Sequence, residues 1–147
     1  MATSTSTIEI DTRAEPAAVF ALLSDLAGYA DWMSHSTAYQ GTRPASGIGE
    51  GDYVDHTPLG DLAGRVVSAT PGERIEFAQG TAGGALRARI VYEITMTGTG
   101  SRITRTGTIT TTGSLRWMHP VLVAVIRREN RRTMGRLRAA LDEDAPS

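Results

Sequence analysis

The residues best suited to chemistry are an arginine, a tyrosine and a histidine on predicted strands. Arg105 alternates with Ile103 and Ile109, so the three side chains should share the inward face of one strand. A guanidinium among apolar side chains needs a partner, because an unpaired buried charge is costly. It could polarise a ligand carbonyl or bind a carboxylate. The alternatives are a strand slip or bulge that places Arg105 in water, or pairing with an acid such as Glu129.

Two further side chains could move protons. Tyr92 falls on the inward face of a predicted strand and could donate a hydrogen bond to a ligand oxygen, or be a core tyrosine whose hydroxyl is satisfied internally. His56 lies near Asp52 and Asp55 and could shuttle protons near neutral pH. A surface strand histidine is the commoner case, and the pattern leaves the facing of His56 and Tyr53 open.

Large apolar side chains are expected near the ends of an internal cavity, where they would line a pocket or its mouth or simply belong to the core. Aromatic residues make up only 5% of the chain, which fits an incompletely filled interior. The predicted ligand-binding set is Trp32, Phe77, Ile90, Tyr92, Arg105, Trp117, Met118, Leu122 and Ile126.

Missing residue types exclude several kinds of chemistry. The chain has no cysteine, which removes disulfides, thiolate metal sites and cysteine nucleophiles. All 15 cationic side chains are arginine, so no lysine can form a Schiff base or act as a general base. The three histidines lack metal-ligand spacing, and Gly47 to Gly51 precedes a strand rather than a helix, unlike a dinucleotide-binding loop. We therefore expect no metal and no cofactor.

Charge and hydropathy favour a cytoplasmic protein of 147 residues in one domain, a monomer or a homodimer. The net charge of −1 gives no overall attraction for nucleic acid or an anionic membrane. The longest apolar run, Val121 to Ile126, is too short to span a bilayer, and no leader sequence precedes the first strand. Six arginines between Arg127 and Arg138 could attract an anionic partner, although a solvated helix face is the stronger interpretation.

Hydrophobic periodicity predicts the elements that must position these residues. A strand over Thr5 to Asp11 is followed by a short helix from Pro16 to near Gly28 and a helical turn over Tyr29 to Met33. Period-two patterns then predict strands at His35 to Thr42, Asp52 to Thr57, Leu62 to Val66, Ile75 to Phe77, Leu86 to Met96 and Ser101 to Thr112. A long helix from Pro120 to Asp142 ends the chain, with an apolar stripe of Met118, Leu122, Val125, Ile126, Thr133, Leu137, Ala140 and Leu141.

This order predicts an α+β fold in which residues 1–147 form one domain. Seven antiparallel strands would make a sheet about six gaps of about 4.8 Å wide, whereas a helix is about 10 Å wide. One long helix covers such a sheet only if the sheet curls around it, and a curled sheet tends to leave an internal gap for a ligand. We expect a seven-stranded curved antiparallel sheet with two short helices and one long C-terminal helix, in the order βααββββββα.

Several segments, in this order, resemble the SRPBCC superfamily of START-like, birch-pollen-allergen-like helix-grip proteins, and in particular its polyketide cyclase/dehydrase group. The resemblance covers essentially the whole chain and is specific for the fold rather than for an activity. The segments are Ile10-Asp11, Glu15 to Asp25, Trp32, the glycines Gly47, Gly49 and Gly51, Gly64 to Val67, Pro71 to Phe77, Gly100 to Thr104, and Met134 to Leu141.

The resemblance implies a protein that binds a small hydrophobic or polycarbonyl molecule in an internal cavity. If it is an enzyme, it would be a cofactor-independent cyclase or dehydratase in which Arg105 stabilises an enolate oxygen and Tyr92 or His56 moves protons. The chain departs from the well-marked aromatase/cyclases because no acid–base constellation can be placed with certainty. The alternatives are a non-enzymatic carrier or sensor of a lipid or other hydrophobic ligand, and a protein-interaction module with a vestigial cavity.

Overall fold

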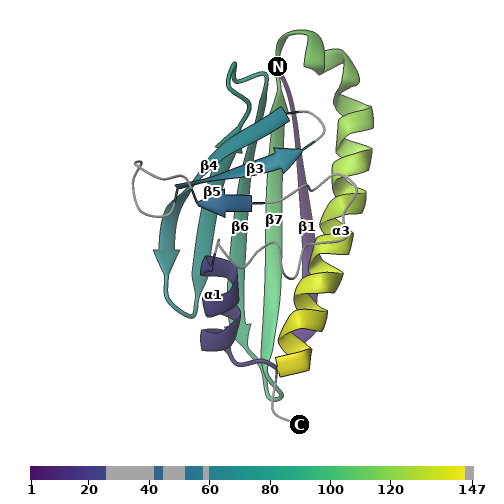
Figure 1. Ribbon diagram of the computed structural model, residues 1–147. Helices are drawn as coiled ribbons and strands as arrows, with labels where there is room; N and C mark the ends of the chain where they lie inside the picture. The colour runs from purple at the N-terminus through teal and green to yellow at the C-terminus, as the bar shows by residue number, and fades with distance from the viewer. Residues whose placement is uncertain (26–41, 45–51, 58–59, 145–147) are drawn as a thin grey trace.

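The computed structural model describes residues 1–25, 42–44, 52–57 and 60–144, and between residues 42 and 61 it describes only the course of the backbone. The strands form one antiparallel sheet in the order β1-β7-β6-β5-β4-β3-β2 (Figure 1). Five strands of seven to eleven residues form its body, and two shorter ones complete it. The strands are β1 (Ala2–Thr12), β2 (Thr42–Pro44), β3 (Asp52–Thr57), β4 (Gly60–Thr70), β5 (Arg74–Gly80), β6 (Leu86–Met96) and β7 (Ser101–Thr111).

Three helical segments accompany the sheet. They are α1 (Pro16–Ser24), the 3-10 segment η2 (Gly113–Met118) and the long helix α3 (His119–Asp144). In Figure 1, α3 runs along the margin of the molecule beside β1, and β3 crosses in front of the strands at the centre of the sheet. The sheet is therefore strongly curled. The expected α+β architecture, an antiparallel sheet with a long C-terminal helix, is confirmed.

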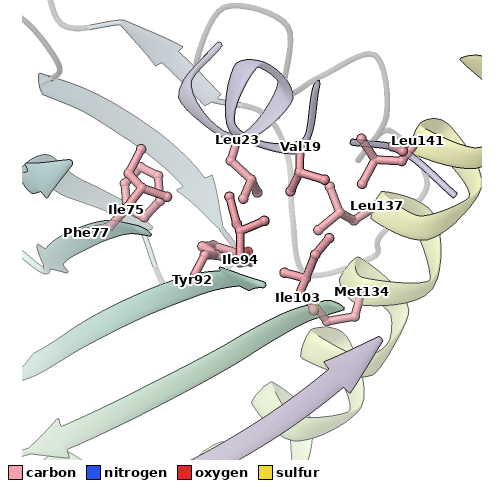
Figure 2. Packing of buried hydrophobic residues seen from close by; sticks show 11 residues of the cluster. Val19, Leu23, Ile75, Phe77, Tyr92, Ile94, Ile103, Met134, Leu137 and Leu141 are labelled. Carbon is pink, nitrogen blue, oxygen red and sulfur yellow. The ribbon is translucent and has the colours of Figure 1, made fainter. Parts of the chain in front are cut away.

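The main core lies where α1 and the second half of α3 meet the inner face of the sheet, the face that packs against the two helices. Figure 2 shows Val19 and Leu23 pointing from α1 towards Ile94 and Ile103 on the strands. We call this set the main cluster; its buried members are Ala14, Val19, Leu23, Ile75, Phe77, Tyr92, Ile94, Ile103, Met134, Leu137 and Leu141.

Alternation along β6 and β7, interrupted at Val91 on β6, sets which side chains face the core. Ile103, Arg105 and Ile109 are buried, while the threonines between them are less buried, so the predicted facing of β7 is confirmed. On β6 the inward assignment holds from Leu86 to Ile94. It was wrong for Met96, which is largely exposed because it lies next to the turn of the β6–β7 hairpin, opposite Ser101.

That hairpin approaches the first strand so closely that it needs a glycine. A Cβ on Gly100 would run into the backbone carbonyl oxygen of Thr12 and the backbone of Arg13. Ser101 next to it donates a 2.7 Å hydrogen bond to the carbonyl oxygen of Ala14. The β6–β7 turn is therefore fixed against the corner where β1 leads into α1.

Several boundaries differ from the predictions. β1 begins at Ala2 rather than Thr5, because its alternating serines and threonines pair with β7 along its whole length. α1 ends at Ser24, whose hydroxyl donates a 2.8 Å hydrogen bond to the carbonyl of Phe20. The predicted helical turn at residues 29–33 lies outside the described residues, and of the predicted strand at 35–42 only Thr42 is described.

The long helix also departs from its predicted apolar stripe. η2, which the periodicity did not predict, leads directly into α3. Val125, expected to face inward, is exposed. Val123 and Met134, which were not part of the predicted stripe, are buried. In the described part of the chain, no helix combines the length and apolar character needed to cross a membrane.

Candidate functional site

A buried arginine and a buried tyrosine meet on the inner face of the sheet. Arg105 on β7 and Tyr92 on β6 are directly opposite each other in the strand register. The Nε–H of Arg105 donates to the Tyr92 hydroxyl at 3.2 Å, and the guanidinium carbon lies 5.7 Å from the centroid of the same ring. Only 7% of Arg105 and 5% of Tyr92 are exposed. The inward facing predicted for both residues is confirmed.

A small residue and an amide complete the surroundings of the guanidinium. A Cβ placed on Gly107 would lie 3.2 Å from Nη1 of Arg105 and 4.0 Å from Nδ2 of Asn130. Asn130 is buried and belongs to α3. Side chains from β6, β7 and α3 therefore converge here, and we call Tyr92, Arg105, Gly107 and Asn130 the Arg105 site.

The Arg105 site lies between two separate apolar clusters. Along β7, Ile103 belongs to the main cluster, Arg105 and Gly107 follow, and Ile109 belongs to a second cluster. The same order is repeated along α3: Met134 belongs to the main cluster, Asn130 lies one turn away, and Ile126 packs against the second cluster. The second, minor cluster consists of Leu62, Leu86 and Ile109, with Leu115 and Ile126 packed against it. The inner face is thus apolar at both ends and polar between them.

Aromatic packing fixes the position of Tyr92. Its ring contacts Phe77 of β5 edge to face, with the ring centroids 6.1 Å apart. Ile90, two residues earlier on β6, is half-buried against the main cluster. Because its ring is held in this way, the tyrosine hydroxyl is presented to Arg105 from a rigid position. Phe77 and Ile90, both predicted to bind ligand, therefore adjoin the Arg105 site.

The charge on Arg105 has no carboxylate partner among the described residues, where its hydrogen-bond partner is the Tyr92 hydroxyl. The predicted alternative was an ion pair with Glu129 on α3. Glu129 instead forms an ion pair with Arg132 at 3.7 Å. Burial makes each polar contact of a guanidinium count for more than it would in water. The site is suited to an oxygen atom that carries full or partial negative charge.

Other members of the predicted ligand-binding set are distributed unevenly. Leu122 is buried, and Ile126 packs against the minor cluster. Trp117 is 80% exposed and Met118 is 49% exposed. The alternative that these two residues belong to the core was wrong, because no residue of η2 is buried. A role at the mouth of a pocket stays a prediction for both.

Two predicted residues cannot be placed near the site. Trp32 lies outside the described residues. His56 lies on β3 opposite Asp61, but only its backbone is described, so the facing of His56, like that of Tyr53, stays open. In the part of the chain that the structure describes, no group of three or more histidine, cysteine, aspartate or glutamate side chains could hold a metal ion.

Asn130 and Gly107 are the site residues that the sequence analysis did not assign. The signal for Asn130 was present, because it falls four residues after Ile126 and four before Met134 on the inward face of the helix. A polar residue at such a core position requires a partner inside the protein. Gly107 gave a weaker signal, a glycine at an inward position of a strand, where a close approach by another group is expected.

One family of known proteins matches this chain over nearly its whole length. Residues 1–142 match the family described as "Polyketide cyclase / dehydrase and lipid transport". This match confirms the resemblance to the polyketide cyclase/dehydrase group of the SRPBCC superfamily. A search of curated proteins finds no match.

Solved structures with the same fold include aromatase/cyclases. The Zhui aromatase/cyclase from a Streptomyces species has a TM-score of 0.79 at 13% identity, covering 95% of this chain and 94% of its own. A conserved protein from Geobacillus kaustophilus has a TM-score of 0.73 at 15% identity, covering 97% and 96%. The di-domain ARO/CYC StfQ from the steffimycin biosynthetic pathway has a TM-score of 0.73 at 14% identity; 97% of this chain aligns with 52% of StfQ. At these identities the likeness shows the fold alone.

Proposed function

Because this chain belongs to the polyketide cyclase/dehydrase and lipid transport family, we propose that it binds a small molecule that combines apolar groups with a carbonyl or carboxylate oxygen. The observation that carries the proposal is Arg105, a guanidinium buried between two apolar clusters and in contact with a tyrosine hydroxyl. The oxygen would lie at the guanidinium, and the apolar groups would contact one or both clusters.

The chemistry of the site supports a ligand oxygen rather than a purely hydrocarbon ligand. A guanidinium has five N–H donors, and the Tyr92 hydroxyl takes only the Nε–H. The Tyr92 oxygen accepts from Arg105, which leaves its own proton available to a second acceptor. Arg105 and Tyr92 together can therefore offer several donors to one ligand oxygen.

An enzymatic version of this function is cyclisation of a flexible polycarbonyl chain. A base removes a proton from the carbon between two carbonyls, the resulting enolate carbon attacks another carbonyl carbon, and the new alkoxide takes up a proton. Arg105 would stabilise the enolate oxygen, and Tyr92 or His56 would transfer protons. Holding the reacting carbons together can remove about 7–11 kcal/mol of a barrier in ideal cases.

The alternative version of this function is a carrier, for which no catalytic base is needed. His119, the histidine whose side chain is described, contacts Ser4 and Thr111 through its two ring nitrogens at 2.8 Å each. It is therefore committed to holding the fold together and is not available as a base at the Arg105 site. The family description also includes lipid transport. A carrier would need the apolar clusters and Arg105 but no proton transfer.

Two fluorescent probes with the same ring system test the proposal. Anilinonaphthalene sulfonate carries an anionic group, and N-phenylnaphthylamine is its neutral counterpart. We expect Arg105→Met to weaken binding of the sulfonate probe about tenfold, the equivalent of about one charge-assisted hydrogen bond. Binding of the neutral probe should change less than about twofold, because no charge-assisted bond is lost.

The matched control is Arg102→Met, since Arg102 is on the same strand but faces the opposite side and pairs with Asp11 at 2.9 Å. Equal losses for both probes, or a loss in the Arg102 control as large as in Arg105→Met, would refute the proposal. Mass spectrometry of small molecules released from the purified protein then separates the two versions. A bound, unmodified lipid supports a carrier, whereas conversion of a polycarbonyl compound into a ring supports an enzyme.

A further inference from the structure

An exposed apolar surface follows the outward face at the start of the long helix. Trp117 is 80%, Val121 61% and Val125 48% exposed, and Met118 lies beside them at 49%. Val121 and Val125 lie four residues apart on one line of the α3 surface, and Trp117 and Met118 end the 3-10 segment η2 directly before α3. The same line continues into the exposed side chains of Arg128 and Arg132. We call these six residues the outer stripe.

The segment that carries the outer stripe is strongly basic although the whole chain is not. Residues 113–132 hold five arginines and one carboxylate, Glu129, which gives a local charge of +4 in a chain whose net charge is −1. Arg116 lies over the ring of Trp117, with its guanidinium carbon 5.4 Å from the ring centroid. Exposed apolar side chains next to concentrated positive charge indicate a partner that is both apolar and anionic.

We propose that the outer stripe docks on the surface of an anionic phospholipid bilayer. Indole rings favour the boundary between lipid headgroups and acyl chains, and Trp117 is the most exposed ring in the described part of the chain. Arginine binds phosphate through paired N–H donors, and every cation in this protein is an arginine. Valine and methionine would enter the headgroup boundary as the apolar side of an amphipathic helix.

The charges and the shape of the stripe argue against other occupants. A second copy of the chain would bring two sets of arginines against each other. A partner protein would have to supply a groove that fits the convex outer face of α3, which forms the margin of the molecule (Figure 1). A fluid bilayer surface accommodates a convex ridge without a preformed groove. The stripe lies outside the core, so docking does not depend on what the Arg105 site binds.

Vesicle co-sedimentation with the full chain tests this docking. The probe is a vesicle of phosphatidylglycerol and phosphatidylcholine, compared with a vesicle of phosphatidylcholine alone. We expect at least tenfold stronger binding to the anionic vesicle. That preference should fall when the ionic strength rises from about 0.1 M to about 1 M, because the screening length shortens from about 10 Å to about 3 Å.

Charge-reversal variants assign the binding to the stripe. Arg128→Glu with Arg132→Glu should abolish the preference for anionic vesicles. The matched control is Arg65→Glu with Arg87→Glu, which makes the same change in net charge at two exposed positions on the sheet and should retain most of the binding. Arg105→Met should bind vesicles as the wild type does. Equal losses in the two double variants would overturn the proposal.

Tryptophan fluorescence reports contact directly and does not depend on net charge. Lipids brominated near the headgroup should quench the wild-type protein, and Trp117→Phe should remove most of that quenching. Absence of quenching in the wild type would overturn the proposal, as would a failure to bind anionic vesicles. A dimer in solution that Val121→Asp dissociates would also overturn it, since the stripe would then be covered by a second copy.

Discussion

Arg105 donates its Nε–H to the Tyr92 hydroxyl at 3.2 Å across two neighbouring strands, from the position directly opposite in the register. The pairing arises from alternation alone, because both residues occupy inward positions of long, regular strands. The guanidinium is buried at this position and forms no ion pair with a carboxylate of the described residues. The inner face of the sheet therefore carries a fixed positive charge between two apolar clusters.

Removing the tyrosine hydroxyl should cost stability and alter the site. In Tyr92→Phe the ring can keep its edge contact with Phe77, but the Nε–H of Arg105 loses its acceptor. An unsatisfied buried donor of this kind costs about 1–3 kcal/mol. We expect that loss in urea denaturation, together with weaker binding of anilinonaphthalene sulfonate. Thr108→Val, which removes a hydroxyl from the outer face of β7, should change stability much less.

Gly107 offers a test of the space beside the guanidinium. In Gly107→Ala the new Cβ would lie 3.2 Å from Nη1 of Arg105, so the end of a flexible side chain must shift by a few tenths of an ångström. Alanine is more favourable than glycine in a strand by about 0.5–1 kcal/mol, and this gain opposes the cost of moving the Arg105 side chain. The free energy of unfolding should therefore change little. Affinity for the anionic probe should nevertheless change, because the guanidinium has moved.

Gly83→Ala is the control for that experiment, since a Cβ at Gly83 meets nothing within 4 Å. If Gly107→Ala left probe affinity at the value of this control, the guanidinium would not contact the bound probe, and the assignment of the Arg105 site would fail.

Alternation made the sheet easier to predict from the sequence than the helix. Arg105 and Tyr92 could be assigned to the inner face because β6 and β7 are long and regular, so a two-residue period fixes the facing of every side chain. The start of α3 gave no such signal. All residues from Val121 to Ile126 are apolar, so the sequence does not distinguish the buried face of the helix from the exposed one. Val125 was therefore predicted to face inward, although Val123 is the buried residue.

Trp117 and Asn130 show two other limits of sequence reasoning. Tryptophan is usually buried, but η2 leaves Trp117 outside the core, and only the tertiary arrangement determines this. Asn130 interrupts the apolar stripe, which the sequence shows, but its nearness to Gly107 and Arg105 depends on the packing of α3 across β7. Contacts between distant segments are not encoded in local periodicity.

The start of α3 is held by a histidine whose role is structural. His119 contacts the Ser4 hydroxyl of β1 through Nε2 and the Thr111 hydroxyl of β7 through Nδ1, both at 2.8 Å. His119→Ala would leave the fully buried Thr111 hydroxyl without this partner and open a cavity, at a cost of about 2–4 kcal/mol. Thermal or urea denaturation measures this loss. Ser114→Ala on the exposed part of η2 should be close to neutral.

The end of α3 is held by a carboxylate that makes folding depend on pH. Asp142 accepts 2.6 Å and 2.9 Å hydrogen bonds from the Thr12 hydroxyl and the Arg13 backbone N–H. The Thr12 bond, followed by the Arg13 bond, holds the pKa of Asp142 below its ordinary value. A carboxyl whose pKa is lowered by folding stabilises the protein above the unfolded-state pKa of about 3.9, and that contribution is lost as the pH falls through the folded-state pKa.

Asp142→Asn should therefore lower the free energy of unfolding at pH 7 by about 1–2 kcal/mol. The difference from the wild type should shrink as the pH falls below about 4, because the unfolded chain then takes up a proton at this carboxyl, and it should vanish once the pH has fallen through the lower folded-state pKa. Asp11→Asn is the matched control. The pKa of Asp11 is also lowered, chiefly by its hydrogen bond to Arg102, but this pair is fully solvated, so its loss should change stability less. Urea denaturation of the three proteins at several pH values measures these differences. A gap between Asp142→Asn and the wild type that stays constant down to pH 2 would show that the ionised carboxylate is not what secures the end of the helix.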